Sequence, residues 1–537
     1  MQPQGKFKRT LNLADLTFLG LGAIIGSGWL FGSMYGAQDA GSDAWVAWLF
    51  GAVAVMLIGL VYAELGAAWP RSGGVVRYPE FSHGSMVGFF TGFAYLLATS
   101  SVAGIEAAAV RTYASYYIPA LTVGGHGPNA GNYTGWGLVV EIVFLVIFFL
   151  INYWSVNVFG KINSVVTALK FILPVLTMIL LLTQLHASNF SIGGASPGGM
   201  HGLFTAVASA GIVFAFLGFR QPIEFAGEAK NPQRTVPLAI ILSIGIGAVL
   251  YVLLQIAFIG AVPASSLAHG WASLNFTSPF ANVAILLGFG WLGTLLFADA
   301  VLSPAGTGNI YLSSTARMSY AWAKNGYFFS LFSRVDPKTG LPRPALVLSF
   351  ILAVLWILPD NFRSWSGLVG AVTSATVLTY IFGPVTLAAL RKSAPDHPRP
   401  FKLGGLGIIG PLAFIAGSWI VYWSGWTIDR LLIGLTLGSL ILYFAFMDRD
   451  AETLARVKRD WRAAIWVIVY YLFMGVMTYI GSFGPLKHPI IPGPYIDSLV
   501  VAVAALIFYY WGVASALPQA LVTSDPEEEP EVGQDVI

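Results

Sequence analysis

Runs of about 20 apolar residues recur along the whole 537-residue chain, and each is long enough to cross the roughly 30 Å hydrocarbon core of a bilayer as a helix. Only 10% of the residues are charged, against about 25% in a soluble globular protein. So few charges cannot cover a water-facing surface of this size, which argues against a soluble protein with a large core. The sequence therefore predicts an all-α polytopic membrane protein.

Hydropathy predicts fourteen membrane-spanning segments. They lie at 14–36, 44–68, 86–118, 135–154, 158–184, 203–228, 236–262, 289–317, 344–359, 364–391, 406–424, 430–447, 464–482 and 495–516. The stretch 276–288 is predicted to form a short amphipathic helix on the outer side. The longest polar connections, near 318–343 and 448–463, are too short for a soluble domain.

The basic residues are distributed unevenly between the connections. With the N-terminus inside, 22 of the 28 lysines and arginines lie in inner connections, four lie in outer ones, and two, Lys170 and Arg220, fall inside spans. Because basic residues collect on the cytoplasmic side, the N-terminal segment 1–13 is predicted to be cytoplasmic. An even number of spans places the acidic tail 517–537 there too. We expect a multi-pass protein of a bacterial-type plasma (inner) membrane, with a first span that is not cleaved.

The first span contains Gly26, Ser27 and Gly28 at its middle. Each glycine in a helix interior costs about 0.5–1 kcal/mol relative to alanine, so a stable helix would avoid this sequence. One interpretation is an unwound segment whose backbone groups face a cavity, the only place where they are tolerated at membrane depth. The other is close packing against a neighbouring helix, which small residues also permit.

The sixth span favours the first interpretation. Gly218 lies at its middle and is followed by Arg220, which is costly in a membrane, and by Pro222, which removes a helix donor. The sixth span follows the first by five helices, and five is odd, so the two halves would have opposite orientations. We therefore predict two inverted repeats, 14–184 and 203–391, each opening with a broken helix, followed by four additional helices over 406–516.

At these residues the sequence resembles the amino acid–polyamine–organocation permeases, which share the LeuT-like fold. The motifs are spread over residues 10–450. They are Ile24-Ile25-Gly26-Ser27-Gly28 in the first span, Pro70, Gly73, Gly74 and Tyr78 after the second, Glu228 through Pro237 after the sixth, and Asn309 through Arg317 with Lys324-Asn325-Gly326 around the end of the eighth. The resemblance implies a LeuT-like 5+5 inverted repeat with broken first and sixth helices.

The resemblance also implies a substrate site. The backbone amides of Gly26, Ser27 and Gly28 would bind the α-carboxylate of an amino acid, because a helix N-terminus attracts anions. The backbone carbonyls that would accept from the α-ammonium group are those of Ile24, Phe214 and Leu217.

Two aromatic residues of the sixth span, Phe214 and Phe216, would close over the bound substrate. For both, packing in the core or against lipid is the alternative, and for Phe216 the two interpretations have equal weight.

Lys170 lies in the fifth span, where a lysine in this family replaces the sodium site of LeuT-like relatives. Its ammonium group would brace the first helix against the eighth and could exchange its proton during transport. A fixed structural charge and snorkelling to the inner face are the alternatives. Among the intramembrane acids, Asp299 in the eighth span could belong to an outer gate or a proton relay, whereas Glu64 near the inner end of the second span could simply face water.

Arg220 bears on the substrate, because several relatives carry a glutamate at its position. A guanidinium group could bind the side-chain carboxylate of aspartate or glutamate with two hydrogen bonds. On this point the chain resembles most the aspartate–proton symporters of the family. The alternative is an internal ion pair, for which the candidate partners are Glu224, Glu106 and Asp299.

We therefore expect a secondary active transporter that symports an acidic amino acid with protons by alternating access. A neutral amino acid symporter, an amino acid exchanger and a membrane-bound amino acid sensor remain alternatives. We expect no enzymatic activity and no cofactor or metal, because the chain has no cysteine and no motif of catalytic or metal-binding spacing. The expected partners are the amino acid and the bilayer. A net charge of +3 gives no reason to expect nucleic acid binding.

Overall fold

The structure is a computed structural model, and it describes residues 11–70, 74–124, 131–154, 170–192, 198–324, 326–336, 342–446, 451–491 and 493–521. Helices account for the regular structure of these residues, which include two isolated β-bridges but no strand. The predicted all-helical class is thus confirmed. The N-terminal segment before Leu11, most of the acidic tail and the first part of the fifth span lie outside the described residues.

Most helices follow the predicted spans. Their bounds are α1 Leu13–Ile24, α2 Ser27–Ala40, α3 Ala44–Ala68, α4 Gly74–His83, α5 Ser85–Ala114, α6 Gly135–Trp154, the helical segment Lys170–Leu182, α8 Gly199–Ser209, α9 Ile212–Phe216, α10 Gln221–Glu224, α11 Pro232–Ala261, α12 Pro279–Leu286, α13 Gly290–Lys324, α14 Arg343–Ile357, α15 Trp365–Tyr380, α16 Phe382–Ser393, α17 Leu406–Trp423, α18 Trp426–Phe446, α19 Ala451–Ile480 and α20 Pro494–Ala514. However, α13 continues to Lys324 and α19 begins at Ala451, so both extend into stretches predicted to be polar connections.

Ten helical segments of the described chain are long and apolar enough to cross a membrane, and three shorter apolar helices accompany them. Each of the fourteen predicted spans falls on a helix, but this count does not establish fourteen crossings. The predicted amphipathic stretch contains α12. The boundaries of the two inverted repeats stay a prediction.

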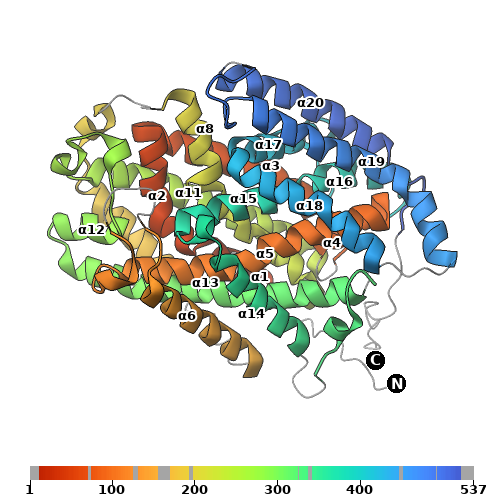
Figure 1. Cartoon of the computed structure of the whole chain (residues 1–537), viewed down its shortest axis with the longest axis horizontal. Helices are drawn as coiled ribbons and strands as arrows, with labels where there is room; N and C mark the ends of the chain where they lie inside the picture. Colours follow the sequence, from red (N-terminus) through yellow and green to blue (C-terminus); the bar gives the residue numbers. More distant parts are fainter. Residues whose placement is uncertain are drawn as a thin grey trace, which may run out of the picture.

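The bundle is built around two long helices, α5 and α13, which pack side by side along much of their length (Figure 1). In this view α19 and α20 lie along the upper edge, and α6 and α14 lie along the lower edge. On another flank α11 packs against α3 and α1. The two interrupted helices therefore lie inside a frame of continuous ones.

Large apolar side chains are exposed on the outside of the bundle, whereas the two cations of the predicted spans are buried inside it. Val249, Ile441 and Ile507 are each more than 60% exposed, as expected for residues whose solvent is lipid. By contrast, Lys170 and Arg220 are at most 1% exposed. Ionisable groups inside a membrane protein face the protein interior because hydrocarbon does not solvate them.

The first span is broken where its glycines predicted. Asn12 caps the start of α1: its side chain accepts from the Asp15 N–H, and Asp15 accepts from the Asn12 N–H in return. The α-helix ends at Ile24, because Ile25 and Gly26 leave the helical region, and α2 begins at Ser27. The two halves of the first span are thus separate helices whose backbone hydrogen bonds do not form one continuous series.

The sixth span is also broken, but not first at Gly218. The α-helix α8 ends at Ser209, and Gly211 takes a φ of +91°, a left-handed conformation that glycine adopts without strain. The chain continues as α9, tightens into a 3-10 turn over Leu217–Arg220, and then forms α10. Pro222 does not cause the break, because it lies in the first turn of α10, where a helix needs no proline N–H.

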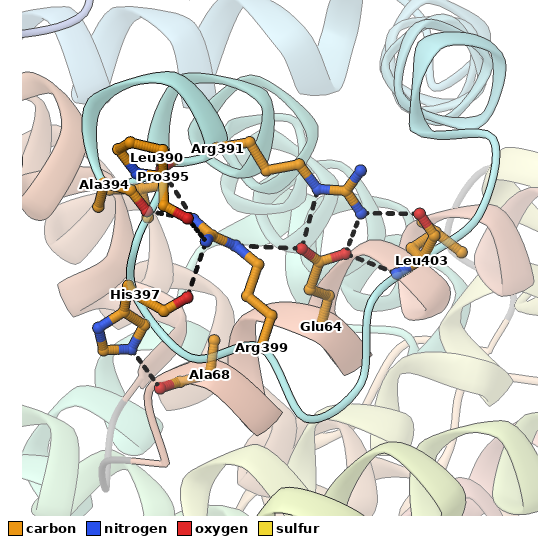
Figure 2. Close-up of polar contacts among 9 residues, drawn as sticks. All are labelled: Glu64, Ala68, Leu390, Arg391, Ala394, Pro395, His397, Arg399 and Leu403. Atoms are coloured by element: carbon orange, nitrogen blue, oxygen red, sulfur yellow. Dashed lines mark hydrogen bonds and ion pairs between the residues drawn. The ribbon is translucent and has the colours of Figure 1, made fainter.

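The connection between α16 and α17 docks on the end of α3, where Glu64 is fully buried (Figure 2). Arg391 Nε donates to Glu64 Oε1 at 2.9 Å, Arg399 Nε lies 3.5 Å from the same oxygen, and the Leu403 N–H donates to Oε2 at 2.7 Å. The expectation that Glu64 faces water is therefore wrong. In Figure 2 the Arg399 guanidinium lies to the left of the Glu64 carboxylate and the Arg391 guanidinium lies above it, and both cations stabilise its charge.

Candidate substrate site

The two broken helices cross at their interruptions. A Cβ added to Gly218 would lie 2.4 Å from the Ala23 carbonyl carbon and the Ile24 nitrogen, and one added to Gly28 would lie 2.9 Å from the Ala215 Cβ. These are backbone and short side-chain atoms that cannot turn away. Both glycines are therefore required for close packing. Glycines of the two broken helices thus also serve close helix packing, so both interpretations of these residues hold at the crossing of the two helices.

A small cavity lies at this crossing, about the size of one water molecule. Its lining comes from α1, α5, α9, α13 and the first break, and it consists of Ala23, Ile24, Gly26, Val102, Glu106, Phe214, Thr307 and Tyr311. Of the predicted substrate-binding residues, Ile24, Gly26 and Phe214 line it. The cavity is too small for an amino acid, so binding requires the lining to move apart.

Glu106 of α5 occupies the predicted carboxylate position. Its Oε2 accepts from the Ser27 backbone N–H at 2.9 Å, at the start of α2, and its Oε1 has no hydrogen-bond partner among the described residues. A Cβ at Gly26 would lie 2.8 Å from that Oε1, so a side chain at this position would require the carboxylate to shift. The Ser27 hydroxyl accepts from Trp365 Nε1 at 2.8 Å. A carboxylate of the protein thus rests where the α-carboxylate of a substrate was predicted.

The backbone carbonyls freed by the first break are bound by side chains of the surrounding helices. Tyr251 of α11 donates to the Ile24 carbonyl at 2.8 Å, and Ser303 of α13 donates to the Ile25 carbonyl at 3.2 Å. The Ile24 carbonyl, predicted to bind the substrate ammonium, also accepts from the Gly26 N–H at 3.0 Å and therefore already has two donors. Because a carbonyl oxygen has two lone pairs, a substrate ammonium group would have to displace one of these donors.

Lys170 joins the first helix to the eighth. Its Nζ donates to the Gly22 carbonyl of α1 at 2.8 Å and to the Thr307 hydroxyl of α13 at 2.7 Å. The side chain is 1% exposed, so it does not snorkel to the membrane surface. No acid lies within ion-pair distance of Lys170 in the described part of the chain, but Glu106 and Asp299 are near enough to act on its charge.

Asp299, on α13, is 1% exposed. Neither of its oxygens has a close hydrogen-bond partner among the residues that the structure describes, although the Trp29 indole interacts with the carboxylate. Two buried acids, Glu106 on α5 and Asp299 on α13, thus act electrostatically on Lys170. Lys170 and Glu106 contact the two sides of the first break, and Asp299 interacts with Lys170 and with Trp29 of α2.

The aromatic residues of α9 have different surroundings. Phe214 lines the cavity and meets Trp365 edge to face, with ring centroids 6.2 Å apart. Phe216 is fully buried between Trp48 and Tyr251, at 5.9 and 5.4 Å, and is not among the cavity-lining residues. The core-packing interpretation describes Phe216. The Leu217 carbonyl accepts a long hydrogen bond from Tyr380, at 3.4 Å.

Arg220 is fully buried and its charge is unpaired. None of its three guanidinium nitrogens has a close hydrogen-bond partner within the described chain, and no acid forms an ion pair with it there. Its guanidinium carbon lies over the rings of Tyr95, at 4.8 Å, and Tyr311, at 5.0 Å. The three candidate partners named from the sequence do not pair with it. Tyr311 lines the cavity, so its ring separates the Arg220 guanidinium from the cavity.

Several residues of the site have roles that the sequence did not predict: Glu106 as the partner of Ser27, and Tyr251, Thr307 and Tyr311 as neighbours of the first break. Glu106 carried a signal, because it is an acid inside the third span. The other three are ordinary helix residues whose roles depend on which helices pack together. Trp365 and Tyr95 are aromatic residues in apolar helices, a pattern that also fits simple packing.

Comparison with known proteins identifies the family of the chain. The sequence profile of the family described as amino acid permease matches residues 11–473. The aspartate-proton symporter of Bacillus subtilis is 42% identical over 98% of this chain and 100% of its own length, and the glutamate/serine transporter of the same organism is 43% identical over 94% of each chain. A branched-chain amino acid permease of that organism is 27% identical over 83% of this chain and 94% of its own. The chain therefore belongs to the amino acid permease family.

Proposed function

We propose that the protein is a proton-coupled symporter of acidic amino acids, that is, of aspartate or glutamate. The observation that carries this proposal is the unpaired, fully buried guanidinium of Arg220 next to the cavity at the helix breaks. A buried cation without a counter-ion is costly, so a site of this kind is stabilised when an anion enters. The relatives named as aspartate-proton symporter and glutamate/serine transporter support the same substrate class.

In the proposed complex the substrate binds along the crossing of the two broken helices. Its α-carboxylate takes the place of Glu106 at the start of α2, where Ser27 N–H donates and the helix N-terminus favours an anion. Its side-chain carboxylate binds Arg220 after the Tyr311 ring has moved aside. Phe214, which lines the cavity, covers the bound amino acid.

Proton coupling is proposed for the three groups around the first break. When the substrate displaces Glu106 from Ser27, the carboxylate loses its donor and takes up a proton more readily. Lys170 and Asp299 are near enough to sense this change. The proton is the coupling ion, and no other cofactor is part of the proposal. The uneven distribution of basic residues supports an orientation with both termini in the cytoplasm.

Transport by the full chain in reconstituted vesicles tests this function. With an acidic exterior and a neutral interior, we expect labelled aspartate to accumulate above its external concentration, and we expect a protonophore to abolish the accumulation. Uptake only into vesicles preloaded with an amino acid would instead identify an exchanger. Binding without uptake of any amino acid would identify a sensor. Uptake of serine but of neither aspartate nor glutamate would contradict the proposed substrate class.

A further inference from the structure

We propose that Tyr95 of α5 is a positioning residue for substrate specificity, because its hydroxyl holds Glu224 away from Arg220 and so keeps the guanidinium available to the substrate. This inference rests on the proposed function, in which Arg220 binds the side-chain carboxylate of an acidic amino acid. It concerns the one internal acid that lies on the same helical turn as Arg220.

Arg220 and Glu224 flank the single turn of α10, with Arg220 at its N-cap and Glu224 at its last residue. Oppositely charged residues four positions apart on a helix are neighbours, and buried charges of opposite sign normally pair. Glu224 is only 5% exposed, so water does not satisfy its carboxylate. Even so, no ion pair between the two appears among the described residues, although their charges interact, and none of the three guanidinium nitrogens has a close hydrogen bond there.

The hydrogen bond that accounts for this separation comes from Tyr95. Its hydroxyl donates to Glu224 Oε1 at 2.5 Å, while the guanidinium carbon of Arg220 lies 4.8 Å from the centre of its ring. The ring face stabilises the cation through the π electrons without using any of its N–H donors. The hydroxyl gives the competing carboxylate a different partner. Arg317 of α13 is a second cation whose charge acts on Glu224.

Removal of the Tyr95 hydroxyl would leave the Glu224 carboxylate to find another partner. The Glu224 carboxylate would lose its short hydrogen bond inside the protein, where an unsatisfied acceptor is unfavourable. The cation one helical turn away is Arg220, and an ion pair with Arg220 is the gain that the proposal expects. An Arg220 paired with Glu224 is neutralised, and an acidic substrate would then have to displace an internal carboxylate in order to bind. Neutral substrates make no such contact.

The Tyr95→Phe variant of the full chain, reconstituted in vesicles, tests the proposal. We expect the KM for aspartate to rise about tenfold, with a smaller change in maximal rate, and the KM for serine to stay the same. Tyr470→Phe is the matched control, because it removes another buried tyrosine hydroxyl, which lies 2.9 Å from Ser418 Oγ on helices away from the site. We expect this control to transport aspartate as the parent does.

The decisive measurement is rescue. In the double variant Tyr95→Phe, Glu224→Gln we expect the KM for aspartate to return to within about twofold of the parent value, because no charged competitor remains. Glu224→Gln alone, which does not depend on the folding of the tyrosine variant, is expected to show an equal or lower KM.

An unchanged KM in Tyr95→Phe, a loss that Glu224→Gln does not restore, or a tenfold higher KM in Glu224→Gln alone would each overturn the role of Tyr95. These results differ from failure of the proposed function, in which the parent protein itself takes up no acidic amino acid.

Discussion

At the scale of single residues, the two cations inside the predicted spans have opposite surroundings. Lys170 donates to two oxygens of α1 and α13, so its charge is stabilised when no substrate is bound. Arg220 has aromatic rings around it and interacts with the Tyr311 and Tyr380 hydroxyls, but its nitrogens have no close hydrogen bond and no ion pair among the described residues. The first arrangement suits a group that belongs to the framework, and the second suits a group whose acceptor arrives with the substrate.

Replacement of Arg220 by alanine should therefore affect acidic substrates selectively. A charge-assisted hydrogen bond contributes about 1.5–3 kcal/mol, so we expect the KM for aspartate to rise about 10- to 100-fold and that for serine to change little. Uptake by vesicles measures both. Arg220→Lys keeps the charge but cannot form the bidentate pair of hydrogen bonds with a carboxylate, so we expect an intermediate KM for aspartate. An equal loss for serine would show that Arg220 is structural.

Replacement of Lys170 by methionine should uncouple uptake from pH. Methionine keeps much of the side-chain volume but removes the charge and both hydrogen bonds that join α1 to α13. We expect aspartate uptake to be slow and to have the same rate at external pH 5.5 and 7.5. Lys402→Met, at a position in the connection after α16, is the control with the normal pH profile. A Lys170→Met protein that retained that profile would exclude Lys170 from coupling.

At the scale of elements, the site depends on two helix breaks that lie against each other. The sequence predicted both, because interior glycines and an intramembrane arginine oppose a continuous helix. It placed the second break at Gly218, whereas the α-helix first ends near Gly211 and Gly218 lies in a 3-10 turn against α1. A glycine that permits a left-handed backbone and one that permits close approach look alike in one sequence.

A methyl group at Gly218 should separate the two broken helices. Its Cβ would lie 2.4 Å from backbone atoms of Ala23 and Ile24, so Gly218→Ala is expected to cost about 1–3 kcal/mol of stability and most of the transport activity. Thermal unfolding in detergent and aspartate uptake measure these losses. Gly245→Ala is the control, since nothing lies within 4 Å of its added Cβ in α11, and it should be neutral or slightly stabilising. Equal behaviour of the two variants would refute the packing argument.

At the scale of the whole molecule, hydropathy predicted the helices well and their connections poorly. The bounds of α3 and α6 match the predicted spans at both ends, because long apolar runs need little tertiary information. The helix α4 was not predicted, since it is short and mixes charged residues and Pro79 with apolar ones. The docking of the α16–α17 connection on Glu64 joins positions more than 300 residues apart in the sequence. Hydropathy does not predict contacts of this kind.

That docking should contribute strongly to stability. Glu64→Gln leaves Arg391 and Arg399 without their shared counter-ion, and disruption of a buried ion pair costs about 3–5 kcal/mol. We expect a lower unfolding temperature in detergent and a smaller decrease for Arg391→Ala, because Arg391 is 22% exposed and Arg399 remains beside Glu64. Asp360→Asn, which breaks an exposed pair with Arg363, should change stability by less than about 1 kcal/mol. Similar unfolding temperatures for the Glu64 and Asp360 variants would contradict this expectation.

The position of Lys170 has a consequence for the ions on which the protein depends. A dissolved metal ion at the junction of α1 and α13 would leave on one side of the membrane in every cycle and would have to be captured again on the other. An amine attached through four methylene groups cannot depart with the cargo, so its positive charge stays at this junction throughout the cycle. If the proposed coupling holds, uptake should therefore proceed at the same rate with and without sodium in the medium, provided that the acidity outside is the same.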